Sequence, residues 1–245
     1  NISQDEVIRN IGYSHYLSAF DLLLPPLFAA FDQLSENDSL HELSEVISLL
    51  KSWDKNSSAS SVATTVAIEW AYKMETKALP ADHPYKRTDA VSAVQSMIDN
   101  TTPKQKLELL QQTLQELRKR FGSWKIGWGD VNRYQRPANG KFDDAKWSLP
   151  VGIAAATWGS LPSFATRRFQ TDKRYGMSGN SFIACVEFGK KVKAKSVITG
   201  GQSFDPDSKH YTDQASMYIN GNFKDVLFYK EDVIKHAERT YHPGE

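Results

Sequence analysis

The sequence has only one cysteine, Cys185, among 245 residues, so it contains no internal disulfide framework and no cysteine-based zinc cluster. Long apolar runs are also missing. The longest, residues 22–30, falls well short of the roughly 20 residues that a membrane span requires, and it holds two prolines. Neither sign of charge is in excess, because 30 Lys and Arg oppose 29 Asp and Glu. We therefore expect a globular protein that binds no nucleic acid and does not span a membrane.

The first half of the sequence has the apolar spacing of helices. Ser3 and Glu6 form a capping box, which predicts a helix that starts within the first few residues and that Pro25-Pro26 should break or restart. Leucine, valine and isoleucine recur at helical spacing in four later segments. These predict helices at about 40–51, from 62 through Trp70, at about 88–100, and at 103–121.

The amino-acid composition changes at Gly122. Gly, Pro, Trp and Asn dominate residues 122–162, where helical periodicity disappears and we expect loops. Residues 181–188 and 194–199 then alternate as strands around a turn with Gly189, which predicts a β-hairpin. Short helices should follow near 213–218 and 231–239. Helices followed by strands indicate an α+β fold, with a helical region over 1–121 and a loop-rich region over 122–245.

Common catalytic motifs are missing. No two histidines have the i, i+4 spacing of a helical zinc site, and there is no nucleophile elbow, phosphate-binding loop or dinucleotide fingerprint. Cys185 lies in the middle of an apolar strand, which favours a small core residue over a nucleophile. We therefore expect neither a metal nor a cofactor in this segment.

Two clusters are dense in polar and aromatic residues. They cover residues 124–134 and 200–214. The second is either a structural loop closed by side-chain hydrogen bonds or a loop that faces a ligand or takes part in catalysis. His210 and Asp213 have the spacing of an oriented general base, but no serine nucleophile can be assigned to them from spacing.

These clusters carry a resemblance to a known family. The string GGQSFDPDSKHYTDQASMY at 200–218 resembles the C-terminal end of the penicillin acylase family, which belongs to the N-terminal nucleophile hydrolases. WGDVNRYQR at 128–136, LPVGIAAATWGSLPSF at 149–164 and the helix pair at 49–72 resemble the same family in matching order. The acyl-homoserine-lactone and aculeacin acylases are the most similar branch.

The resemblance implies part of an αββα sandwich. Members of this family are secreted or periplasmic precursors that cut themselves into an α and a β chain. The serine at the new β-chain N-terminus attacks the amide, its own α-amine acts as base, and an asparagine side chain helps to hold the oxyanion. The implied substrates are acyl amides, either acyl-homoserine lactones or penicillin-type amides, which links the family to quorum quenching and antibiotic metabolism.

The present sequence departs from that pattern. It opens with Asn1, which has neither hydroxyl nor thiol, and it resembles only the part of the β chain after the nucleophile, the oxyanion asparagine and the usual structural calcium ligands. We therefore expect a segment that is inactive alone and whose partners are the α chain and the N-terminal half of the β chain. The motif residues should then brace loops and dock the last helix; they are Asp130, Asn132, Arg133, Gln202, Ser203, His210, Tyr211, Asp213 and Gln214.

Two alternatives remain at this stage. The chain could be an autonomous binding or scaffold domain in which Trp124, Trp128, Trp147 and Trp158 line a surface, or a self-sufficient serine hydrolase that uses His210. If the segment belongs to a larger sandwich, the strands at 181–188 and 194–199 should present unpaired edges and uncovered apolar faces, so that the isolated chain associates.

Overall fold

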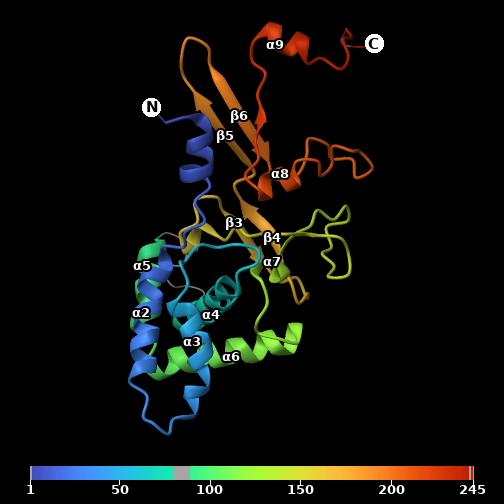
Figure 1. Ribbon diagram of the computed structural model, residues 1–245. Coiled ribbons are helices and arrows are strands. Elements are labelled where there is room, and N and C mark those ends of the chain that lie inside the picture. The colour runs from blue at the N-terminus through green and yellow to red at the C-terminus, as the bar shows by residue number, and fades with distance from the viewer. Residues whose placement is uncertain (1, 80–88, 243, 245) are drawn as a thin grey trace. The chain divides into compact units, whose positions relative to one another are not determined.

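The computed structural model describes residues 2–79, 89–242 and 244 (Figure 1). Two compact units form, one from residues 14–179 and one from the residues up to Tyr13 together with those from Asn180 onward. The change of composition at Gly122 therefore does not mark the boundary of a compact unit. The reason is that Trp128 and Trp158, which follow Gly122, are buried in the same core as the preceding helices.

The larger unit begins with a group of helices. Ser61 caps α4 by accepting from Thr64 N, and Thr102 with Gln105 forms a capping box at the start of α6. The predicted helices in this part are present, although the predicted start at Thr88 lies outside the described residues. The elements are α2 (Ala19–Asp32), a 3-10 helix (Ser39–Leu43), α3 (Ser44–Lys51), α4 (Val62–Ala78), α5 (Ala90–Asp99) and α6 (Pro103–Phe121).

The prediction for the first helix was wrong in part. The Ser3–Glu6 capping box does start a helix, α1 (Gln4–Glu6), which continues as a π-helix (Val7–Gly12), but helical structure then stops until α2. Helix α2 runs through Pro25 and Pro26 without a break. Pro25 is exposed and Pro26 half-buried, so the backbone carbonyls that lose their helical hydrogen bonds to these prolines lie on the solvent-facing side of α2. Buried leucines on the opposite side of the helix pack into the core.

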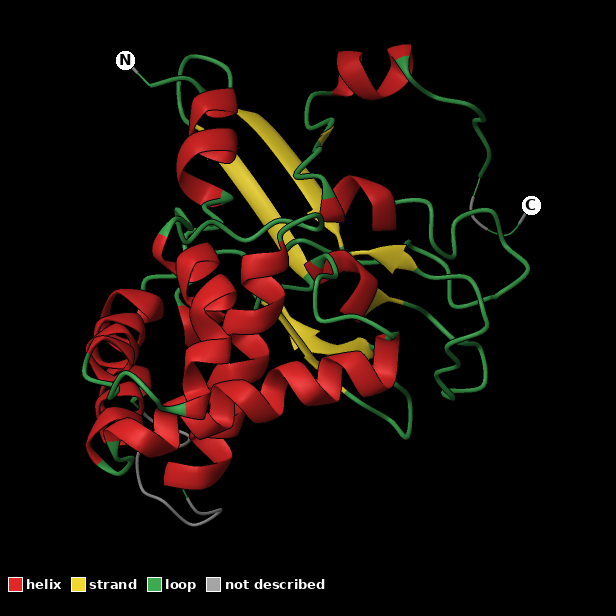
Figure 2. Cartoon of the chain, turned by 60° about the horizontal axis from the view of Figure 1, so that its bottom comes forward, coloured by secondary structure: helices red, strands yellow, loops and turns green. Residues whose placement is uncertain are grey.

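A four-stranded sheet completes the larger unit (yellow in Figure 2). Its strands are β1 (Asn132–Tyr134), β2 (Leu149–Pro150), β3 (Phe164–Arg167) and β4 (Arg174–Gly179), in the order β2-β1-β4-β3, after the short helix α7 (Trp128–Val131). The β1–β4 pair is parallel and the other two pairs are antiparallel. The sequence predicts only loops between 122 and 162, because strands this short show no alternating pattern.

The smaller unit is built on a three-stranded antiparallel sheet, in the order β5-β6-β7. The predicted hairpin is present as β5 (Phe182–Glu187) and β6 (Lys193–Ile198). Helix α1 contacts this hairpin, since Gln4 Nε2 donates to Cys185 O at 2.7 Å and Lys195 Nζ pairs with Asp5. The remaining elements are α8 (Ala215–Ile219), β7 (Lys224–Asp225) and α9 (Lys230–Lys235), which is shorter than the predicted final helix.

Two further predictions can be compared with these elements. Cys185 is half-buried on a largely exposed strand, so its assignment as a core residue was wrong. The α+β prediction is confirmed, since helices occupy most of the first half and both sheets follow them. None of the described helices is both long and apolar enough to cross a bilayer.

Candidate functional site

Backbone hydrogen bonds close the loop of residues 200–214. Gly200 O accepts from Gln214 N at 2.8 Å, and the carbonyl of His210 accepts from Ser203 N at 3.1 Å. The Gln214 side chain is buried, and its Oε1 accepts from Ile198 N at 3.3 Å, so this side chain ties the loop to β6. Gln202 is exposed, and its Oε1 accepts from Lys224 Nζ. The loop therefore has a fixed conformation at its base.

Gly201 occupies a position where no other residue fits. A Cβ there would collide with the carbonyl of His210 and would lie 2.6 Å from Asp213 Oδ1. We expect Gly201→Ala to destabilise the loop by about 1–3 kcal/mol, because a backbone carbonyl cannot move aside as a flexible side chain can. Hydrogen exchange of residues 200–214 measures this effect. Gly189→Ala is the matched control, since its nearest contact, Lys191 O, lies 3.6 Å away; equal exchange in both variants would contradict the close packing at Gly201.

The same loop holds the His210–Asp213 pair. His210 Nδ1 lies 2.8 Å from Asp213 Oδ2, and both side chains are exposed. The carboxylate can orient the ring as it would orient a general base. However, Ser208 Oγ accepts from the backbone N–H of His210, and no serine hydroxyl in the described residues is hydrogen-bonded to the ring. The described pair is thus an oriented imidazole without a nucleophile.

The remaining loop residues of the predicted set make local contacts. Ser203 Oγ accepts from Asp205 N at 3.1 Å. Tyr211 is half-buried, and its N–H donates to Ser208 O. These bonds stay within the loop and define turns at 203–205 and 208–211.

The second predicted cluster joins α7 to the larger sheet. Asn132 is fully buried, and its Nδ2 donates to Val151 O at 2.8 Å and to Ile153 O at 2.9 Å. The Arg133 guanidinium donates to Gly129 O and makes two bonds to Ser148, one to its hydroxyl and one to its carbonyl. Asp130 is exposed. Asn132 and Arg133 therefore hold the strands around α7, whereas the exposed Asp130 makes none of these bonds.

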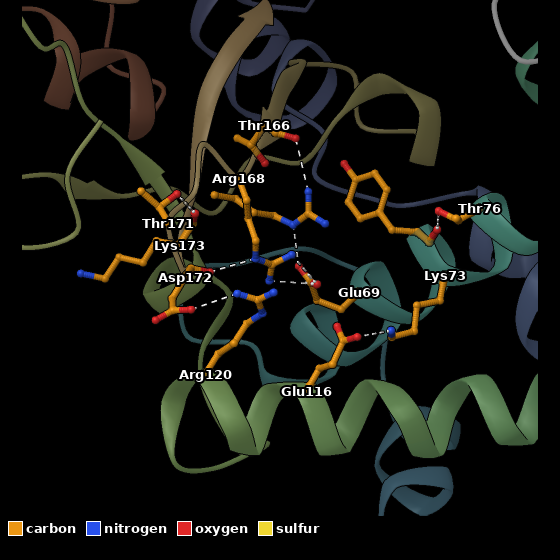
Figure 3. A network of polar contacts seen from close by, with 12 residues as sticks. Glu69, Lys73, Thr76, Glu116, Arg120, Thr166, Arg168, Thr171, Asp172 and Lys173 are labelled. Carbon is orange, nitrogen blue, oxygen red and sulfur yellow. Dashed lines mark hydrogen bonds and ion pairs between the residues drawn. The ribbon is translucent and has the colours of Figure 1, made fainter. Parts of the chain in front are cut away.

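The strongest electrostatic feature of the larger unit was not found from the sequence. Glu69 of α4 is buried, and its carboxylate bonds Arg174 Nε at 2.6 Å and both terminal nitrogens of Arg168 at 3.1 Å (Figure 3). We call these three residues the Glu69 cluster. The Arg174 guanidinium also lies 4.1 Å from the centre of the Tyr72 ring. The only sequence signal was a charged residue between Ile68 and Trp70 in an apolar helix.

The two arginines set the ionisation of Glu69. Burial alone would raise the pKa of this carboxyl group, but the Arg174 and Arg168 guanidinium groups outweigh burial and hold the pKa below its usual value. The glutamate therefore stays charged, as a charge-assisted link between α4 and the segment of β3 and β4. This cluster is suited to a structural role, since both guanidinium groups bond the Glu69 carboxylate.

The tryptophans do not form a common surface. Trp124, Trp128 and Trp158 are buried in the core of the larger unit, and Trp147 alone among the four is exposed. The expectation that they line a ligand surface was therefore wrong for three of the four. As for metals, no group of three or more His, Cys, Asp or Glu residues within the described parts of the chain has the geometry to hold an ion.

Comparisons with known proteins bear on both clusters. A family model described as penicillin amidase matches residues 3–235. Among solved structures, a thermostable penicillin G acylase from Alcaligenes faecalis is similar at 16% sequence identity and a TM-score of 0.47. The similarity covers 94% of this chain and 47% of that one, so the chain spans less than half the length of that acylase.

Proposed function

This chain belongs to the penicillin amidase family, and we propose that it is the C-terminal portion of an acylase β chain whose parent hydrolyses an acyl-amide bond. The observation that carries the proposal is the family match, which includes both motif clusters. In the proposed reaction a nucleophile displaces the amine to form an acyl-enzyme, and water then releases the acid. Acyl-homoserine lactones and penicillin-type amides are the proposed substrates.

In this proposal the segment supports the catalytic residues of the parent without supplying them. The His210–Asp213 pair lacks a serine partner in the described residues, which favours an inactive chain. The Gln214 and Asn132 contacts keep two loops in place, as the bracing role requires. The nucleophile, the oxyanion asparagine and the ligands of a structural calcium would come from the first half of the β chain. We place the assembled enzyme in the periplasm or outside the cell.

Amide hydrolysis tests this proposal. The purified chain is incubated with an acyl-homoserine lactone and with a penicillin-type amide, and the released amine is quantified. We expect no turnover by the chain alone, and turnover after it is mixed with the separately produced remainder of the parent. A complex that forms but hydrolyses neither substrate would contradict the acylase proposal.

A matched variant separates this result from catalysis by the chain itself. If the chain alone is active and His210→Ala abolishes that activity, the segment is a self-sufficient hydrolase and the proposed division of labour is wrong. If His210→Ala does not alter the turnover of the reassembled enzyme, the imidazole has no part in the chemistry, as we expect from its exposed position.

A further inference from the structure

The loop that joins β1 to β2 in the larger unit contains a pocket. The loop covers residues 135–148, and the pocket has a volume of about 500 Å³. Residues 135–139 form one wall, and Lys146 and Trp147 form the other. This volume lies within the range of pockets that bind small organic molecules.

Bonds within the loop hold the two walls together. Gln135 Nε2 donates to Trp147 O at 3.1 Å and to Asp143 O at 3.0 Å, and Gln135 Oε1 accepts from Asp143 N at 3.0 Å. The middle of the loop is fixed to the sheet, because Phe142 stacks on Tyr175 of β4 with the ring centroids 5.0 Å apart. The pocket is therefore formed before a ligand binds, which lowers the cost of ordering on binding.

The walls offer an aromatic ring and positive charge. The Trp147 side chain is 61% exposed, and its ring contacts no other ring or cation within the described residues. Lys146 is exposed, and its Nζ has no ion-pair partner in the parts of the chain that the structure describes. The half-buried Arg136 adds a second cation to the lining. An indole beside two cations is suited to an aromatic anion.

None of the described residues that line the pocket is acidic. The two acidic residues of the loop make bonds elsewhere. Asp143 Oδ1 accepts from Ala145 N at 2.9 Å. The Asp144 carboxylate accepts from Tyr175 Oη at 2.9 Å and from Asp172 N at 2.7 Å. The positive charge of the walls is therefore not offset by a carboxylate in the lining.

We propose that this pocket binds a small aromatic carboxylate. The ring of the ligand would stack on the Trp147 indole, and its carboxylate would pair with Lys146 Nζ in the positive field of Arg136. An acidic side chain from the remainder of the parent is another source of a carboxylate. Protein interfaces are depleted in lysine, however, so the composition of the walls favours a small molecule. This inference goes beyond the proposed acylase activity and does not depend on it.

Isothermal titration calorimetry with naphthalene-2-carboxylate tests the proposal. We expect one site per chain with a dissociation constant below about 1 mM. Naphthalene-2-carboxamide, which has the same ring system and no charge, should bind about 10-fold more weakly. The indole N–H resonance that is missing from the spectrum of Trp147→Phe should shift when the carboxylate is added. The proposal is overturned if the carboxylate does not bind or if the two compounds bind equally well.

Two lysine variants locate the carboxylate. Lys146→Gln should weaken binding of the carboxylate by about 5-fold and leave binding of the carboxamide unchanged, since only the ion pair is lost. Lys141→Gln is the matched control, because Lys141 is an exposed lysine of the same loop that does not line the pocket. Equal losses in the two variants would mean that the carboxylate responds to the overall charge of the loop, which would contradict a pairing with Lys146.

A third variant tests the contribution of the ring. Trp147→Ala should weaken binding of both compounds by about 10-fold, while the circular dichroism spectrum stays that of the folded chain. Unchanged affinity in this variant would exclude stacking on the indole.

The titration is repeated after the chain is mixed with the separately produced remainder of the parent. A site for a small molecule keeps its affinity for naphthalene-2-carboxylate in this mixture. If a complex forms and the affinity is lost, a group of the remainder occupies the pocket, and the proposal is overturned.

Discussion

Glu69→Gln should lower the free energy of unfolding by about 3–5 kcal/mol, because it leaves Arg168 and Arg174 without their counter-charge in a buried site. The glutamine keeps the shape of the side chain, so the loss comes from charge and from hydrogen bonding. Side chains of the Glu69 cluster are between 8% and 19% exposed, and water cannot replace the carboxylate well. Urea unfolding followed by circular dichroism measures the change.

A nearby exposed ion pair provides the control. Lys73 Nζ lies 2.7 Å from Glu116 Oε1, at a distance similar to that in the Glu69 cluster, but half of the Glu116 side chain is exposed. We expect Glu116→Gln to cost less than about 1 kcal/mol, since solvent screens such a pair. Similar losses in the two variants would show that burial does not give the Glu69 cluster its strength.

The same cluster makes stability depend on pH. The folded-state pKa of Glu69 lies below its ordinary value of 4.5, so the stabilisation is complete above that value. It is lost as the pH falls through the lower folded-state pKa, because the unfolded chain then binds the proton more readily. The unfolding free energy of the unmodified chain should therefore fall in acid more steeply than that of Glu69→Gln, and parallel curves would contradict the assignment.

Local signals in the sequence predict local structure well. The Ser3–Glu6 capping box and the alternation around Gly189 specify a helix start and a hairpin within a few residues, and both are present. The failures involve long-range contacts. Helix α2 continues through Pro25 because packing outweighs a local penalty, and the strands of the larger sheet are too short to show a period.

The candidate site could likewise be predicted only in part from the sequence. The family motif drew attention to Asn132 and Gln214, and the structure gives each a buried hydrogen-bonding position. Their partners could not be read from the sequence, since a side-chain amide does not indicate which carbonyl it binds. Glu69 bonds Arg168 and Arg174, which follow it in the sequence by about a hundred residues. No pattern of residue spacing predicts a contact between positions so far apart in the chain.

Trp158→Ala should also cost about 3–5 kcal/mol, because a large aromatic side chain leaves a cavity that the surrounding helices fill only in part. The ring is buried, with its centroid 6.0 Å from that of Phe20 in α2 and 5.4 Å from that of Tyr72 in α4. Trp147→Ala is the matched control, since this side chain is 61% exposed, and it should change stability by less than about 0.5 kcal/mol. A large loss at Trp147 would mean that its loop is part of the core.

Trp158 and Glu69 are joined through one aromatic ring, and a double-mutant cycle can detect the connection. Trp158 packs edge-on against Tyr72, whose ring lies under the Arg174 guanidinium that Glu69 binds. In Glu69→Gln the arginine loses its anchor, so Tyr72 should be less fixed and a change at Trp158 should cost less.

With the milder Trp158→Phe, which keeps the double variant folded, we expect the combined loss to be smaller than the sum of the single losses by at least about 0.5 kcal/mol. The same cycle with Glu116→Gln should be additive, because Glu116 pairs with Lys73, which is not a member of the Glu69 cluster. Additivity in both cycles would show that the aromatic core and the Glu69 cluster stabilise the larger unit independently, even though they touch at Tyr72.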